Sequence, residues 1–284
     1  MSKEKKNFFI RAVVLLALAA AGYFGYQSYF YVSTDDAYIQ AHSLMLSARI
    51  SGTVLKVLVD ENDKVKAGQL LAQIDDQDYS AAYNQAIADQ SSVQADLIQA
   101  AQDYERIKKL YQDQAVSKSD YDKAIARYNN LQARLKGDQY KADAAKLNLG
   151  YTQITAPEDG SIAKKAVEPG MVIPPGQALF GFVSSQERWV TANFKETQLS
   201  GIHPGEKVDV EVDAVSGKKY EGVVDSIGSA TGSTFTLLPP DNSTGNFTKV
   251  VQRIPVKIKL LNLAASDIDR LAAGLSAVVD VKIH

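Results

Sequence analysis

A sequence repeat that is interrupted by a long insertion constrains the fold of this chain more than any other feature. The segment GTVLKVLVDENDKVKAGQLL, residues 52–71, aligns without a gap with GSIAKKAVEPGMVIPPGQAL, residues 160–179. Each copy has a strand-like run, a polar turn and a Gly-Gln pair 16 positions after its first glycine. Because an isolated β-hairpin is marginally stable, we expect the two copies to pack as one β-sandwich, although 76 residues separate Ile74 from Tyr151.

Two such halves resemble a lipoyl or biotinyl carrier domain, in which a lysine on the tight turn between the halves takes the cofactor. Here the long insertion occupies the place of that turn, and neither of its ends shows an Asp-Lys-Ala type of turn. We therefore expect a lipoyl-like scaffold without a cofactor. A biotin- or lipoate-carrying protein is the alternative, and it would require a modified lysine in this unit.

The insertion has the spacing of a two-helix coiled coil. Positions in two series recur at alternating intervals of three and four, and all are apolar or aromatic except Gln90 and Asp138. Because the flanking halves must meet, the helices must form an antiparallel hairpin, and about 35 residues per helix give a length of roughly 50 Å. The series are Tyr83, Ala86, Gln90, Val93, Leu97, Ala100, Tyr104, Ile107 and Tyr111, and Tyr121, Ala124, Tyr128, Leu131, Leu135, Asp138, Ala142, Ala145 and Leu149.

The polar segment DQAVSKSD, residues 113–120, interrupts this spacing and predicts the turn of the hairpin. Ser119, with Asp122 three residues later, predicts the N-cap of the second helix. A turn this far from any core has no stabilising role beyond closing the hairpin. Its exposed residues are therefore available to a partner.

The N-terminal segment predicts a membrane anchor. Residues 12–32 carry no charge, and Gln27 and Ser28 are the clearly polar members of a run that is close to the ~20 residues needed to span a bilayer. Four basic residues precede the run, which places the N-terminus in the cytoplasm and residues 33–284 on the other side. The alternative is a cleaved signal peptide, because ALAAA offers small residues. The aromatic cluster at residues 23–31 instead favours a retained anchor.

Short alternating runs from Trp189 onward, separated by Gly, Pro and Asn, predict a small antiparallel β-barrel. The segment SLMLSARI, residues 43–50, could join this barrel or bridge it to the sandwich. The stretch TLLPPDNSTGNF, residues 236–247, is either a solvated loop or a contact with another protein. Flanking apolar residues could belong to the barrel core or to an exposed patch; they are Phe235, Leu237, Leu238 and Phe247.

The composition argues against catalysis and nucleic-acid binding. A net charge of −2 gives no general attraction to nucleic acid, and the lack of cysteine excludes thiol catalysis and the common zinc motifs. The histidines are scattered, and adjacent carboxylates on extended chain point to opposite sides. We expect no enzyme activity, no cofactor and no metal. The histidines are His42, His203 and His284, and the adjacent carboxylates are Asp35 with Asp36 and Asp75 with Asp76.

The order of anchor, half sandwich, helical hairpin, second half and further β structure resembles the HlyD family of periplasmic adaptors, also called membrane fusion proteins. In that family an Arg-x3-Leu-x6-Ser pattern docks the hairpin into a TolC-like outer-membrane channel, and Arg106, Leu110 and Ser117 match it here. Arg106 and Leu110 lie one helical turn apart, so both would enter one groove, while Ser117 would add a hydrogen bond. The alternative for Arg106 is a solvated charge paired with Asp103 or another acid.

Three stretches, residues 32–41, 188–199 and 231–258, resemble the EmrA-type subgroup in particular. That resemblance implies drug export with a proton-driven transporter of the major facilitator type, and a homo-oligomer that is a trimer or a hexamer. It also implies an inner-membrane protein of a Gram-negative bacterium, anchored by a single span, with most of the chain in the periplasm. The alternative is an adaptor of an ABC-type (type I) system that exports peptides or protein. The hairpin is shorter than the arms associated with EmrA, which leaves open whether it reaches a channel.

The expected fold class is mixed α and β: a transmembrane helix, a lipoyl-like β-sandwich split by an antiparallel α-helical coiled-coil hairpin, and a small antiparallel β-barrel. The expected boundaries are 1–32 for the cytoplasmic N-terminus and anchor, 33–50 for a linker or barrel strand, 51–75 and 150–184 for the lipoyl-like halves, 76–149 for the hairpin and 185–284 for the barrel.

Overall fold

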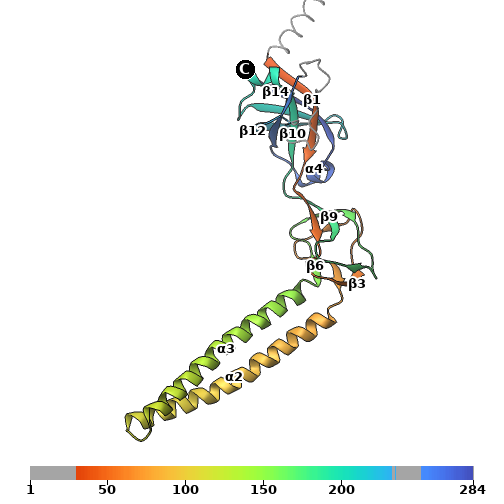
Figure 1. Cartoon of the computed structure of the whole chain (residues 1–284). Coiled ribbons are helices and arrows are strands. Elements are labelled where there is room, and N and C mark those ends of the chain that lie inside the picture. The colour runs from red at the N-terminus through yellow and green to blue at the C-terminus, as the bar shows by residue number, and fades with distance from the viewer. Residues whose placement is uncertain (1–29, 232–233, 235–250, 284) are drawn as a thin grey trace, which may run out of the picture. The chain divides into compact units, whose positions relative to one another are not determined.

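The computed structural model describes residues 30–231, 234 and 251–283 (Figure 1). Most of the predicted anchor and the apolar residues Phe235, Leu237, Leu238 and Phe247 lie outside this range. Within it, no helix is both long and apolar enough to cross a membrane. The chain divides into two compact units, one formed by residues 44–182 and the other by the residues before and after that segment.

The first unit contains two four-stranded sheets in which the repeat copies exchange strands. The sheet orders are β2-β9-β7-β4 and β6-β5-β3-β8. In the second sheet Gly52 of one copy pairs with Ile173 of the other, and in the first sheet Val65 pairs with Gly160. Neither copy can therefore complete a sheet alone. The strands are β2 (Ser43–Ser47), β3 (Gly52–Val57), β4 (Lys64–Val65), β5 (Leu70–Ile74), β6 (Gln153–Thr155), β7 (Gly160–Lys165), β8 (Val172–Ile173) and β9 (Ala178–Ser184).

Residues 43–47 form an edge strand of this unit and take no part in the barrel. The core between the sheets is apolar and draws on both repeat copies, with Leu71, Ile162 and Phe180 fully buried. Because the same core holds β5 and β6 in register next to each other, the two ends of the long insertion leave the sandwich from neighbouring strands.

The insertion forms the expected helical hairpin, with α2 (Gln77–Gln112) running beside α3 (Lys118–Gly150) (Figure 1). The predicted seam is confirmed, because the positions of both series are buried or half-buried except Tyr111, which is 37% exposed. Asp138, the charged member of the seam, is buried on the seam side. Its carboxylate contacts Lys141 Nζ at 2.8 Å and Arg134 Nε at 4.0 Å, so its charge is balanced by cations that reach in from solvent.

The second unit contains a closed six-stranded barrel with the order β1-β10-β13-β12-β11-β14, which confirms the predicted barrel. Buried residues alternate along its strands, as in Lys207–Val212, where Val208, Val210 and Val212 point inward. The elements are β1 (Tyr31–Gln40), β10 (Trp189–Lys195), the 3₁₀ helix η1 (Glu196–Gly201), β11 (Lys207–Val212), β12 (Lys219–Ile227), β13 (Arg253–Leu260), α4 (Ala265–Arg270) and β14 (Ser276–Lys282).

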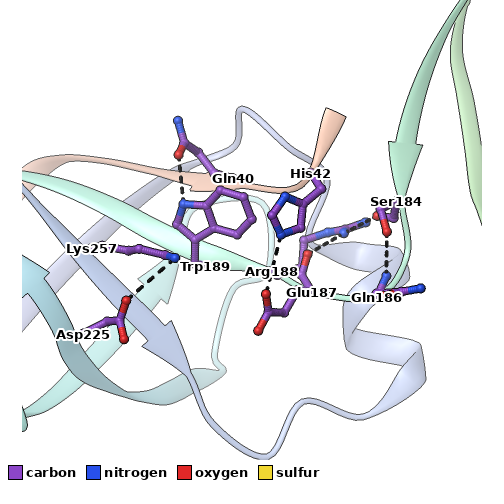
Figure 2. Close-up of polar contacts among 9 residues, drawn as sticks. All are labelled: Gln40, His42, Ser184, Gln186, Glu187, Arg188, Trp189, Asp225 and Lys257. Carbon is purple, nitrogen blue, oxygen red and sulfur yellow. Dashed lines mark hydrogen bonds and ion pairs between the residues drawn. The ribbon is translucent and has the colours of Figure 1, made fainter. Parts of the chain in front are cut away.

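A buried arginine fixes the chain where it enters β10 (Figure 2). Arg188 is 7% exposed and donates hydrogen bonds to the carbonyl oxygens of Ser184, Glu187 and Leu271 at 2.6, 2.9 and 2.9 Å. Burial lowers the pKa of this guanidinium. The Ser184 N–H donates to the carbonyl oxygen of His42 at 2.9 Å, so the two chain segments at this end of the barrel are joined by main-chain hydrogen bonding.

Candidate functional site

The far end of the hairpin closes through a short turn with satisfied main-chain groups. After α2 ends, Gln114 adopts a left-handed conformation with φ of 61°, and the Ala115 N–H donates to the carbonyl oxygen of Leu110 at 2.8 Å. This arrangement satisfies carbonyls that the end of a helix leaves without partners. The turn is thus an ordered structure that presents the last turn of α2.

The N-cap of α3 is Ser117, so the prediction of Ser119 was wrong. The Ser117 Oγ accepts a hydrogen bond from the Asp120 N–H at 3.2 Å and donates one to Asp120 Oδ2 at 2.7 Å. The sequence contains the Ser-x-x-Asp pattern twice, two residues apart, and both copies satisfy the same capping rule. The structure uses the earlier copy, which leaves Ser119 inside the first helical turn.

The three residues of the predicted docking pattern lie together at this end of the hairpin. Arg106 and Leu110 are four residues apart on one side of α2, and Leu110 is 38% exposed despite its apolar side chain. The Arg106 guanidinium, 67% exposed, forms an ion pair with Asp103, as the alternative reading of this residue anticipated. The Ser117 hydroxyl is engaged in the cap of α3.

Stacked tyrosines hold the two helices together just behind the turn. The Tyr104 and Tyr128 rings lie 5.5 Å apart at an angle of 13°, and the Tyr111 and Tyr121 rings lie 4.9 Å apart at the same angle. A hydrogen bond with Tyr104 raises the pKa of Tyr121. Offset stacking of this kind adds to the free energy of burial. The tyrosines therefore favour a fixed presentation of Arg106 and Leu110.

A groove of about 310 Å³ runs between the helices on the Arg106 side. Four of its lining residues are buried or half-buried: Ala100, Asp103, Ile107 and Ala124. The charged lining residues are Asp103, Arg106, Lys123 and Arg127. Sequence reasoning missed Lys123 and Arg127, although each directly precedes a seam residue of α3, just as Arg106 precedes Ile107 on α2.

A second group of polar contacts joins the three stretches that carry the EmrA resemblance. On β1, the buried Thr34 donates from Oγ1 to the carbonyl oxygen of Asn193 at 2.9 Å. Asn193 Nδ2 donates to Asp36 Oδ1 at 3.1 Å, and Arg253 Nη1 donates to Asp36 Oδ2 at 2.5 Å. Asp36 therefore links β1, β10 and β13 at a bulge of β1 that falls between Thr34 and Ala37.

The two described histidines each lie beside a glutamate of their own surroundings. His42 lies 3.6 Å from Glu187 and packs against Trp189 (Figure 2), while His203 lies 3.3 Å from Glu206. His284 lies outside the described residues. In the parts of the chain that the structure describes, no three His, Asp or Glu side chains are placed to hold a metal ion.

Comparisons with known protein families agree with this architecture. Residues 43–185 match a family model described as "RND MFP, barrel-sandwich hybrid domain", and residues 188–282 match one described as "AAEA-like beta-barrel domain". The first match contains both sheets and the whole helical hairpin, and the second contains most of the barrel.

Curated relatives match over nearly the full chain. The chain is 32% identical to the colistin resistance protein EmrA of Acinetobacter baumannii over 338 aligned positions, which cover 99% of this chain and 96% of that protein. It is also 32% identical to the multidrug export protein EmrA of Escherichia coli, over 87% of this chain and 75% of that protein. The first alignment is longer than the present chain, so the Acinetobacter protein has inserted residues.

Solved structures share the fold. The crystal structure of MacA from Actinobacillus actinomycetemcomitans has a TM-score of 0.65 at 22% identity and covers 90% of this chain and 80% of that one. The structure of the periplasmic adaptor protein EmrA has a TM-score of 0.50 at 20% identity and covers 89% of this chain and 99% of that one.

Proposed function

The chain belongs to the membrane fusion protein family of periplasmic adaptors, in its EmrA-type subgroup, and from this premise we propose that it joins an inner-membrane transporter to a TolC-like outer-membrane channel. In this proposal the residues before β1 anchor the chain in the inner membrane and the described units lie in the periplasm. The transporter is a proton-driven protein of the major facilitator type. The exported compounds are drugs or other small molecules, as the names of the EmrA relatives suggest.

One observation supports the docking part of the proposal above all others. An apolar side chain, Leu110, is 38% exposed one helical turn from Arg106, in the last turn of α2 next to the turn of the hairpin. Leu110 lies outside the buried seam cluster, and it can fill a pocket between helices of a partner. Ser117 contributes by fixing the turn that carries this surface, since its hydroxyl caps α3.

A ring of adaptors would multiply the weak contact that each hairpin offers. We propose a trimer or a hexamer, in which several tips meet the channel together. Linked binding events are intramolecular after the first one, so overall affinity can exceed that of a single contact by a large factor without new contacts.

Leu110→Asp tests this function. The substitution places a charge where the apolar side chain would enter the partner, so it should abolish export. Export is measured as the drug resistance that the adaptor gene restores to a strain lacking it. The adaptor should remain folded and abundant, because Leu110 lies outside the buried seam. Leu147→Asp is the matched control: Leu147 is also exposed on the hairpin, at 58%, but lies near the sandwich end of α3. Wild-type export by the Leu110→Asp protein would refute the assignment of the tip.

A further inference from the structure

The groove beside Leu110 carries more positive charge than the docking pattern accounts for. Arg106 forms an ion pair with Asp103 on its own helix. Lys123 lies 3.9 Å from Asp120, and with side-chain exposures of 77% and 54% that pair contributes little. Across the described residues Arg127 forms neither an ion pair nor a hydrogen bond, although it lines the groove. The groove therefore offers a guanidinium and an ammonium group to an incoming anion.

We propose that Lys123 and Arg127 complete the docking surface by receiving carboxylate side chains of the outer-membrane channel. This inference rests on the function proposed above and extends it from α2 to α3. The partner it specifies is a helical surface with acidic side chains. Those side chains would enter between α2 and α3 while an apolar pocket of the same surface takes Leu110.

The floor of the groove explains how a side chain of the partner gains access. Three seam residues line the groove, and two of them, Ala100 and Ala124, have short side chains that leave space between the helices. The third is Ile107, and Tyr104 and Tyr128 fill the seam next to the alanines. The resulting space of about 310 Å³ is open to solvent and can admit an acidic side chain.

The two basic residues lie on the same side of the hairpin as the docking pattern. Arg106 lines the groove and lies one turn from Leu110 on α2. Lys123 and Arg127 are themselves four residues apart on α3, so they lie on one face of that helix. A single partner surface can consequently contact Leu110, Arg106 and the two α3 cations at once.

The chemistry of these groups favours carboxylates. A guanidinium binds a carboxylate through two parallel hydrogen bonds, which gives both energy and orientation. Charged groups at the edge of an interface also accelerate the encounter between partners, and this effect weakens with salt. The α3 cations would therefore help to select a channel with acidic helices and to orient it against Leu110.

The test compares the yield of a photo-crosslink in living cells. A photoreactive amino acid at position 110 reports contact with the channel, and the adduct is identified by mass spectrometry. We expect the yield of the channel adduct to fall at least tenfold in Arg127→Glu and further in Lys123→Glu/Arg127→Glu, and to be largely retained in Arg127→Lys. Lys136→Glu is the matched control, because Lys136 is a basic residue of the same helix that lies outside the groove.

The outcomes separate this inference from the proposed function. If the adduct forms at the unsubstituted yield in both charge-reversed proteins, the role of Lys123 and Arg127 is wrong while docking through Leu110 stands. If position 110 of the unsubstituted protein gives only adducts with a second copy of the adaptor, both proposals are wrong. As a control for folding, the helical circular-dichroism signal must be lost at the same melting temperature in all the proteins compared. If a charge-reversed protein melts at a lower temperature, Arg127→Gln replaces it, because this change removes the positive charge without adding a negative one. The yield of the channel adduct should then also be lower than in the unsubstituted protein.

Discussion

Asp267 shows how a single buried carboxylate contributes to the barrel. It lies on α4, is 6% exposed, and its Oδ1 accepts from Lys218 Nζ at 2.6 Å. The hydrogen bond and charge of Lys218, with a further hydrogen bond from the Ala264 N–H, lower the pKa of Asp267, against the opposing effect of burial. A carboxyl group with a lowered pKa in the folded state stabilises that state when it is ionised.

Asp267→Asn should therefore destabilise the barrel in a pH-dependent way. The pKa in the folded protein is below the unfolded value of about 4. The contribution is thus fully present above that value and is lost as the pH falls through the folded pKa. We expect the variant to melt several degrees lower at pH 7 and the difference to shrink below about pH 4. Trp189, the only tryptophan of the chain, lies in the barrel and provides the fluorescence signal.

Asp209→Asn is the control for this measurement, because Asp209 is an exposed carboxylate of β11 in the same barrel. A melting difference between wild type and Asp267→Asn that stayed constant from pH 7 to pH 3 would show that the charge of Asp267 is not the cause.

Ser117 offers a test that separates capping from direct contact with a partner. Removing an N-cap side chain costs about 1 kcal/mol, so Ser117→Ala should increase amide hydrogen exchange in the first turn of α3 and reduce drug resistance. Ser117→Asn keeps a good capping group whose amide can also donate to Asp120, so it should behave like wild type in both measurements. If the asparagine variant exported as poorly as the alanine variant, the hydroxyl itself would be the important group.

Only part of the candidate docking site could be predicted from the sequence. The pattern of Arg106, Leu110 and Ser117 could be read from the sequence because its members are close together in one segment. The groove could not, because Lys123 and Arg127 lie across the hairpin from Arg106, and their side depends on how α2 and α3 are paired.

The hairpin is the element whose structure follows most directly from its sequence. A repeat of 3.5 residues specifies a seam whatever the rest of the fold does, and every position of that seam except Tyr111 is at least half-buried. The barrel was also predictable as a class from its alternating strands. The pairing of β3 with β8 and of β4 with β7, which joins the two repeat copies, could not be predicted. Periodicity carries no information on which strands pair.

Asp138 should make the seam less stable than an apolar residue at the same position would. It is 6% exposed and satisfied by Lys141 and Arg134 of its own helix. Lys141 and Arg134 are 76% and 65% exposed, so removing the carboxylate leaves no unpaired charge in the seam, and an apolar side chain there no longer has to offset the desolvation of a buried charge. We therefore expect Asp138→Leu to raise the melting temperature of the helical signal. The matched change Gln90→Leu tests the other polar seam position.

A lower melting temperature for Asp138→Leu would contradict this account of the seam. It would mean that the ion pairs of Asp138 contribute more to hairpin stability than an apolar contact with the facing helix does.

At the scale of the whole molecule, the order of the parts carries the functional interpretation. The family followed from that order together with stretches such as residues 32–41 and 188–199, and the comparisons confirm it. The proposed transporter and channel are separate polypeptides, so they are identified by capturing the partners of this chain.

Purification of the full-length adaptor under mild crosslinking should recover a transporter of the major facilitator type. We expect this because Asp36 in the barrel bonds to Asn193 and Arg253, and these three residues come from the three stretches that resemble EmrA. Asp36→Ala should reduce recovery of the transporter, whereas Leu110→Asp should leave it unchanged because Leu110 lies in the hairpin. Recovery of an ABC-type transporter instead would support an adaptor of a type I export system.

The decisive measurement is the identification of the protein that contacts the hairpin tip in cells. Photoreactive amino acids at positions 110 and 117 of the otherwise unaltered chain would be activated in cells, and the adducts identified by mass spectrometry. We expect adducts with a TolC-like outer-membrane channel at both positions. Adducts formed only between copies of the adaptor would contradict this expectation, and would instead make the tip an element of self-assembly.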